Sequence, residues 1–264
     1  MLKPKRDEYR ALLLGGGARE HAIAEALYRS GRVALYAVAH NYNPGIDLLA
    51  KQLVDHNERD VDWIAKWAVQ QGIDFAVIGL EDPLDVGLPD VLARVGISTI
   101  GPSWKAAQIE TSKLFLRKLM RRHNIPGQVD YYYFQDADKL REFLLGSDRQ
   151  YALKPLGLTA GKGVKVMGVQ LGSKEEAIAY GRNVIEEQIG GAAGIIVEER
   201  VIGEEFTLQV FVDGKNIVPM PLVKDFKLAY DGDRGPNTGS MGSYSQADGL
   251  LPFVSEESRK VALD

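Results

Sequence analysis

The stretch KPLGLTAGKGVKV, which begins at Lys154, combines lysines and glycines in a way that could bind phosphate. It is not a Walker loop, because three residues instead of four separate Gly157 from Gly161 and Gly163 stands where a hydroxyl should ligate magnesium. The alternating residues that follow predict a strand. We therefore expect a loop between two strands, whose amides and Lys162 close over nucleotide phosphates above Lys154. The alternative for Lys154 is a lysine that only extends its ammonium into solvent.

A second glycine-rich stretch, LGGGAREHA, follows one predicted strand and opens a predicted helix, so backbone amides and the helix dipole converge there on an anion. Glu20 occupies the third glycine position of a dinucleotide fingerprint, which argues against such a cofactor. Gly16, Gly17 and Arg19 are candidates for holding the phosphate end of a substrate; a plain tight turn is the alternative. Glu81 lies in the loop at the carboxyl end of another predicted strand and is either a ligand or a residue that solubilises its loop.

Two later segments are rich in polar residues. IVEERVIGEEF, residues 196–206, carries four carboxylates that are costly to hold beside apolar strands unless a ligand or cation uses some of them. A hinge there could present backbone groups to an adenine ring and one carboxylate to a ribose. KDFKLAYDGDRGPNTGSMGSY, residues 224–244, predicts a long polar loop without secondary structure. Its apolar and aromatic residues favour a substrate-binding loop over disorder.

The composition limits the functional classes. The 264 residues are 45% hydrophobic, and 32 basic against 36 acidic residues leave a net charge of -4, so we expect no nucleic-acid partner. The absence of cysteine excludes disulfides, thiolate metal sites and cysteine nucleophiles, and leaves four histidines. The charged first ten residues and the short apolar run after them predict neither a signal peptide nor a membrane span. We expect a cytoplasmic protein with no membrane partner.

The order of the predicted elements indicates two kinds of region. The first hundred residues alternate short apolar runs with amphipathic ones, which is typical of a parallel α/β layer. Strands are predicted there at 11–14, 35–39, 75–78 and 97–100, and helices at 20–30, 61–71 and 83–95. After Pro126 a mixed, antiparallel region is predicted, with strands at 130–134, 151–154, 164–169, 195–199, 206–212 and 217–220, helices at 137–145 and 175–188, and a last helix capped by Ser255.

Between the two regions, residues 105–123 predict a single amphipathic helix. Its polar side carries the cations Lys113, Arg117, Lys118, Arg121 and Arg122. We interpret most of them as a solvated face.

Five motifs, in the order GGGAREHA, GPSWKAAQIETSK, KPLGLTAGKGV, VEERVIGEEFTLQVFVDGK and GPNTGSMGSY, resemble those of the phosphoribosylamine-glycine ligases, which are ATP-grasp enzymes of purine biosynthesis. The resemblance implies ATP-dependent ligation of glycine to 5-phosphoribosylamine through a glycyl phosphate. It also implies three parts: an N-terminal α/β substrate-binding domain (1–102), the small ATP-grasp subdomain with the glycine loop (103–200) and the start of an incomplete large α+β subdomain (201–264).

Site residues follow from the resemblance position by position. It assigns ATP to Lys113, Lys154, Gly157, Gly161, Lys162, Gly163, Glu198, Glu199, Val201 and Glu205. It assigns the substrates glycine and 5-phosphoribosylamine to Gly16, Gly17, Arg19, Glu81, Asp225, Lys227, Pro236, Asn237, Thr238 and Gly239. Lys154, Asp225 and Lys227 are expected to be catalytic.

The sequence departs from the family pattern at several positions. Phe226 and Leu228 replace a histidine and an arginine, Ser240 replaces a glycine and Leu80 replaces a proline. The resemblance implies Mg²⁺ ligands beyond Asp264, so no metal ligand is predicted in this chain, and a separate C-terminal fragment could be a partner. A nucleotide-binding relative without ligase activity and another ATP-grasp carboxylate-amine ligase are the alternatives.

Overall fold

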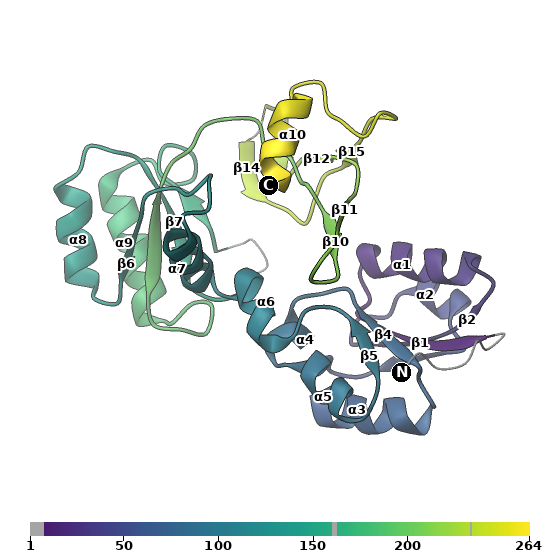
Figure 1. Ribbon diagram of the computed structural model, residues 1–264. Helices are drawn as coiled ribbons and strands as arrows, with labels where there is room; N and C mark the ends of the chain where they lie inside the picture. The colour runs from purple at the N-terminus through teal and green to yellow at the C-terminus, as the bar shows by residue number, and fades with distance from the viewer. Residues whose placement is uncertain (1–7, 160–162, 233) are drawn as a thin grey trace. The chain divides into compact units, whose positions relative to one another are not determined.

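The computed structural model describes residues 8–159, 163–232 and 234–264 (Figure 1). Gly161 and Lys162 of the predicted phosphate loop lie outside the described residues. The chain divides into two compact units, of which the first ends at Leu116 and the second begins at Arg117. In the described part of the chain, no helix is both long enough and apolar enough to cross a membrane.

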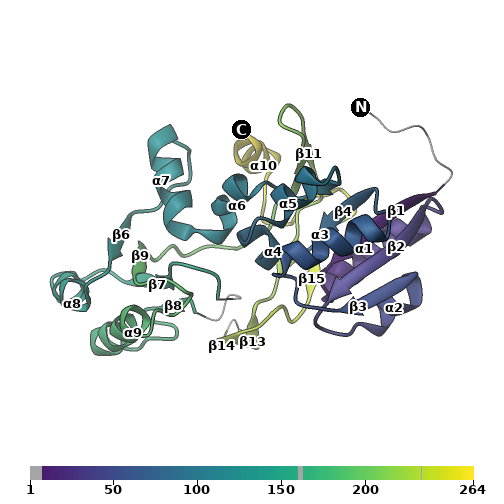
Figure 2. The same cartoon turned by 90° about the horizontal axis from the view of Figure 1, so that it is seen from below.

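The first unit is built on the predicted parallel sheet, which has five strands in the order β3-β2-β1-β4-β5. Figure 2 labels four of them, β1 to β4. The strands are β1 (Tyr9–Leu14), β2 (Val33–Ala39), β3 (Gln52–Asp55), β4 (Phe75–Ile78) and β5 (Ser98–Ile100). The helices are α1 (Ala18–Arg29), α2 (Pro44–Leu49), α3 (Val61–Gln70), α4 (Asp82–Asp85), α5 (Leu88–Arg94) and α6 (Trp104–Thr111). This arrangement confirms the predicted α/β class of this part.

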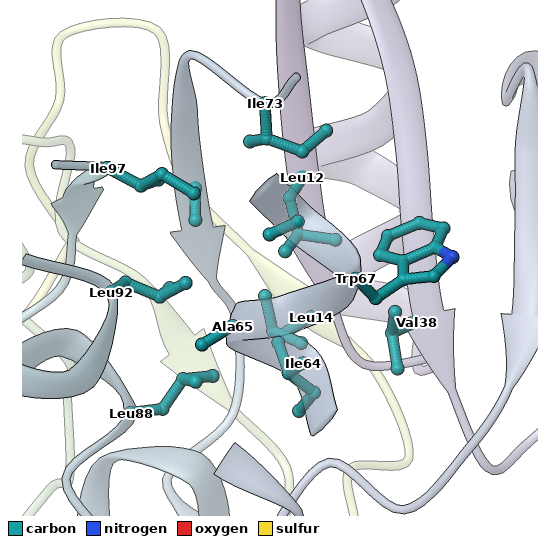
Figure 3. Close-up of a cluster of buried hydrophobic side chains, with 12 residues drawn as sticks. Leu12, Leu14, Val38, Ile64, Ala65, Trp67, Ile73, Leu88, Leu92 and Ile97 are labelled. Atoms are coloured by element: carbon teal, nitrogen blue, oxygen red, sulfur yellow. The ribbon is translucent and has the colours of Figure 1, made fainter. Parts of the chain in front are cut away.

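Alternate residues of β1 pack against helices on opposite faces of the sheet. Leu12 and Leu14 join one core cluster with residues of α3 and α5, which Figure 3 shows around Ile64 and Leu92. Leu13 points the other way and joins a second cluster with α1 and α2. Because a parallel sheet is covered on both faces, the loops that follow its strands are left exposed at the carboxyl edge.

Three sequence predictions in this unit and at its boundary with the second were wrong or incomplete. The helix predicted at 83–95 is broken at Gly87, whose φ of 78° is left-handed and ends α4 before α5 begins. The helix predicted at 105–123 is two helices, since Ser112 is extended and its hydroxyl accepts a hydrogen bond from the amide of Phe115 in α7 (Lys113–His123). The short elements α2 and β3 were not predicted at all.

The second unit contains a four-stranded antiparallel sheet in the order β6-β9-β7-β8. The strands are β6 (Tyr131–Phe134), β7 (Tyr151–Pro155), β8 (Lys165–Val166) and β9 (Ile195–Glu199). Helices α8 (Ala137–Leu145) and α9 (Lys174–Glu186) cover one face and α7 lies on the other, as Figure 2 shows. The predicted strand 164–169 is only two residues long, because Gly168 turns the chain with a φ of 79°.

The rest of the second unit consists of short antiparallel pairs and a final helix. The pairs are β10 (Val210–Val212) with β11 (Ile217–Pro219), β12 (Lys224–Asp225) with β15 (Ser243–Tyr244), and β13 (Leu228–Tyr230) with β14 (Arg234–Asn237); α10 spans Glu256–Leu263. The prediction that 224–244 lacks secondary structure was therefore wrong. The predicted strand 206–212 is shorter than expected, whereas the Ser255 cap of α10 is confirmed.

The turn between β10 and β11 gives a test by pH. The Asp213 carboxylate accepts hydrogen bonds from the amide and side chain of Asn216 and the amide of Lys215, which lower its pKa to about 2. Because the pKa is lower in the folded state, the contribution to hairpin stability is complete above the ordinary value of about 4 and is lost as the pH falls toward 2. A carbon-13 NMR titration should show this midpoint; a midpoint near 4 would contradict the turn geometry.

Candidate active site

The centre of the candidate site in the second unit is a buried carboxylate held by two cations. Glu198 lies in β9, with a residue exposure of 3%. Its Oε2 accepts a hydrogen bond from Lys154 Nζ at 2.6 Å. Arg117 donates from Nε to Oε1 at 2.6 Å and from Nη2 to Oε2 at 2.9 Å. Two of the predicted ATP residues, Lys154 and Glu198, are thus in direct contact.

The strand pattern explains why these charges meet. Ile195 and Val197 of β9, with Leu153 of β7, face the core beneath α8 and α9. Side chains alternate along a strand, so Glu198 and Lys154 emerge on the opposite face. Arg117, from α7, reaches Glu198 there.

Glu198 is ionised in this setting. Burial by itself raises the pKa of the Glu198 carboxyl, but the hydrogen bonds from Arg117 and the charge of Lys154 outweigh it and hold the pKa below the ordinary value for glutamate. The site therefore contains a fixed buried anion with two cations in contact. Taking the three charges together, the cluster carries one net positive charge, which suits a polyanionic ligand.

Arg117 corrects the sequence interpretation of the cationic helix face. Its side chain is only 15% exposed and is paired with a carboxylate 81 positions away, so it does not belong to a solvated face. Two signals in the sequence could have indicated this. Arg117 lies one helical turn after Lys113, and Glu198 follows three apolar residues of a strand, where a charge needs a partner.

The glycine loop joins β7 to β8, as predicted, and these strands pair antiparallel. At Gly157 an added Cβ would lie 2.0 Å from the carbonyl oxygen of Gly190, so a side chain does not fit without movement of the backbone. Gly163, at the other end, is buried, and its carbonyl accepts a hydrogen bond from the Tyr180 hydroxyl. Both ends of the loop are therefore anchored to the second unit.

The residues predicted to form a hinge lie at the end of β9 and just after it. The amide of Glu199 donates to the carbonyl of Asp130 at 3.0 Å, and Val201 is 68% exposed. Glu205 is exposed and pairs with Lys227 at 3.1 Å. A carboxylate predicted to bind the ribose of ATP therefore lies beside a lysine predicted to be catalytic. Of the four clustered carboxylates, only Glu198 is buried.

The segment 224–244 holds its own candidate residues together. Thr238 donates to the carbonyl of Lys227 from its amide at 2.7 Å and from its hydroxyl at 2.9 Å. The Ser240 hydroxyl donates to Asp225 Oδ1, and its backbone has a φ of 144°, a region that side chains rarely adopt. Pro236 and Asn237 lie in β14, and Gly239 follows them. Ser240 therefore sits in a glycine-like conformation and contacts a candidate catalytic carboxylate.

The candidate residues of the first unit meet at the carboxyl edge of its sheet. The Gly17 amide donates to Glu20 Oε2 at 2.8 Å, so the buried Glu20 caps α1. Arg19 donates to the carbonyl of Gly79 at 2.9 Å, two residues before Glu81. An added Cβ on Gly16 would lie 2.2 Å from the carbonyl oxygen of Asn41. The turn that holds Gly16 and Gly17 and the loop that holds Glu81 are therefore connected through Arg19.

Sequence reasoning missed Asn43 as a support of this edge. Its side chain accepts hydrogen bonds from the amides of Gly45 and Ile46, which caps α2, and donates to the carbonyl of Gly16 at 3.0 Å. The order Asn43-Pro44 at the start of a helix is a recognisable cap signal.

No group of three or more His, Cys, Asp or Glu side chains among residues 8–159, 163–232 and 234–264 could hold a metal ion. Lys113 begins α7 and is half-buried. The net positive charge of the cluster formed by Lys154, Arg117 and Glu198 fits a phosphate-bearing ligand. The described side chains offer no cluster for Mg²⁺.

Comparison with known protein families assigns both parts of the chain to domains of a single family. Residues 9–110 match the N domain of phosphoribosylglycinamide synthetase, and residues 111–264 match its ATP-grasp (A) domain. The chain belongs to the phosphoribosylglycinamide synthetase family. The fold class predicted from the sequence, a parallel α/β domain followed by ATP-grasp structure, agrees with this membership.

Individual relatives support the family assignment. The chain is 46% identical over 256 residues to the phosphoribosylamine-glycine ligase of Methanothermobacter thermautotrophicus and 48% identical over 250 residues to that of Methanopyrus kandleri. These alignments cover 96% and 94% of this chain, but 57% and 56% of the relatives. The crystal structure of the Thermotoga maritima phosphoribosylamine-glycine ligase superposes with a TM-score of 0.70 at 28% identity, covering 89% of this chain and 55% of that one. The chain thus spans little more than half the length of these family members.

Proposed function

We propose that this protein takes part in the ATP-dependent ligation of glycine to 5-phosphoribosylamine, which gives glycinamide ribonucleotide, ADP and phosphate. The observation that carries the proposal is the cluster of Lys154, Arg117 and Glu198 beside the anchored glycine loop, in a chain of the phosphoribosylglycinamide synthetase family. Lys154 is partly exposed near the end of its strand and contacts the buried carboxylate of Glu198. A lysine in this position is suited to binding nucleotide phosphates.

The reaction balances in two steps. The carboxylate oxygen of glycine attacks the γ-phosphorus of ATP, and the bond to the β-phosphate oxygen breaks to give glycyl phosphate and ADP. The amine of phosphoribosylamine then attacks the glycyl carbonyl carbon, inorganic phosphate leaves, and the amine loses a proton. Both steps need positioning and charge stabilisation more than a protein nucleophile.

The proposal extends to the roles of individual residues, which the resemblance of their motifs to the family supports. We assign the nucleotide to Lys113, Lys154, Glu198, Glu199, Val201 and Glu205 with the glycine loop, and the phosphoribosylamine to Gly16, Gly17, Arg19 and Glu81. Asp225, Lys227 and the segment 236–239 are assigned to the meeting point of glycine and the amine. In domain terms, we assign residues 1–102 to substrate binding, 103–200 to the small ATP-grasp part and 201–264 to the beginning of the large part.

A phosphate-release assay tests the proposal. The protein expressed from its complete reading frame is mixed with Mg²⁺, ATP, glycine and freshly formed phosphoribosylamine. Phosphate release is expected only when all four are present. Release that persists with another amine in place of phosphoribosylamine would indicate a different carboxylate-amine ligase. ATP binding with no release for any amine would indicate a nucleotide-binding relative.

A further inference from the structure

We infer that Arg117 is a positioning residue, which keeps the buried Glu198 carboxylate neutralised so that Lys154 can exchange it for the phosphates of the nucleotide. The inference rests on the proposed function, because it takes the ligand of this site to be ATP. It assigns a role to a side chain that would touch neither the phosphates nor the reacting atoms.

The hydrogen bonds of Glu198 differ between its two partners, Arg117 and Lys154. Arg117 uses two nitrogens and reaches both carboxylate oxygens, a bidentate geometry that a guanidinium holds well. Lys154 uses one nitrogen and reaches only Oε2, which Arg117 also contacts. If Lys154 moves away, each oxygen of Glu198 still has a charged donor.

The exposed fractions of the three side chains also indicate that Arg117 is held in place and that Lys154 can move. The side chain of Arg117 is 15% exposed and that of Lys154 is 25% exposed, while the Glu198 side chain is 4% exposed. Lys154 is also the last residue but one of β7, just before the glycine loop, and a lysine ammonium on a flexible stem can turn between partners. Arg117 is therefore the fixed cation and Lys154 the movable one.

The energetic reason is the cost of leaving a charge alone inside the protein. An ionised carboxylate that loses its only partner in a buried site is strongly unfavourable. Without Arg117, a lysine that turned to a nucleotide would leave Glu198 in that state. Binding of ATP would then have to overcome the cost.

Five proteins decide the point by calorimetric titration with ATP: the unchanged protein, Arg117→Met, Arg117→Lys, Glu198→Gln and the double variant Arg117→Met/Glu198→Gln. Arg117→Met should bind ATP at least about tenfold more weakly, because the buried charge loses its fixed partner. Arg117→Lys should restore most of the affinity, since it returns a cation. The double variant should bind as well as Glu198→Gln alone, since no charge remains to be neutralised.

The controls separate the outcomes. Arg122→Met removes an exposed arginine from the same helix and should leave ATP affinity unchanged. Equal affinity of Arg117→Met and the unchanged protein would overturn the inference, and so would a double variant that binds more weakly than Glu198→Gln. If Arg117→Met does not fold, that comparison of the double variant with Glu198→Gln still decides. An unchanged protein that does not bind ATP would instead overturn the proposed function.

Discussion

Lys154→Ala should bind ATP between about 10 and 150 times more weakly than the unchanged protein, because a lost charge-assisted hydrogen bond costs roughly 1.5 to 3 kcal/mol. The fold should survive the change. Arg117 still contacts both oxygens of Glu198, so the buried carboxylate keeps a cation after the lysine is removed. The loss is therefore expected in binding, which isothermal calorimetry measures directly, and not in the far-ultraviolet circular dichroism.

Lys174→Ala is the matched control for this prediction. Lys174 lies in the same unit and pairs with an exposed carboxylate, Asp148, at 3.3 Å. Surface pairs of this kind contribute little, so both ATP affinity and stability should stay close to those of the unchanged protein. Equal ATP affinity of Lys154→Ala and Lys174→Ala would refute the assignment of Lys154 to the nucleotide.

Gly157→Ala should lower the free energy of unfolding by about 1 to 3 kcal/mol, since an added methyl group has to displace packed atoms. The atom in the way is the carbonyl oxygen of Gly190, 2.0 Å from the new Cβ, and it belongs to the backbone. Either the start of the glycine loop or the turn before β9 must move. Because the loop begins there, ATP binding should weaken together with stability. Urea unfolding followed by circular dichroism gives the free energy.

Gly203→Ala provides the comparison in the same unit. A Cβ at Gly203 meets no other atom within 4 Å, and the residue is exposed. Its unfolding midpoint should match that of the unchanged protein or rise slightly, because alanine has fewer unfolded conformations to lose. If Gly157→Ala unfolds at the same urea concentration as Gly203→Ala, the close contact with Gly190 is not a constraint on the loop.

The sequence predicted most closely those elements whose pattern is local and regular. Helix 137–145 and strand 195–199 were predicted at their observed bounds, because amphipathic spacing and apolar runs are local properties. The strand-loop-strand arrangement around the phosphate loop was predicted for the same reason. Short pieces such as β3 carry too few residues for a periodic pattern. The small pairs within 224–244 depend on partners that the spacing of residues does not identify.

Among the residues of the candidate site, too, those with a local sequence signal were predicted and those that depend on a distant partner were not. Lys154 was singled out because a charge at the end of an apolar strand is locally unusual. The role of Arg117 depends on a pairing across 81 positions, and only its place one helical turn after Lys113 distinguishes it, within its own helix, from the exposed Arg122. Long-range ion pairs of this kind become visible only when the sheet and helix are placed together.

The buried carboxylate of Glu198 also has a consequence for how the sheet is assembled. Strand β9 is hydrogen-bonded on both sides, to β6 and to β7, and its side chains alternate between two faces. A slip of the strand by one residue would turn Glu198 into the apolar core beneath α8 and α9 and would aim Val197 at Arg117. That misaligned sheet would bury an uncompensated negative charge among leucines and isoleucines. The charged cluster therefore disfavours the shifted alignment and stabilises the observed one, whether or not a nucleotide is bound.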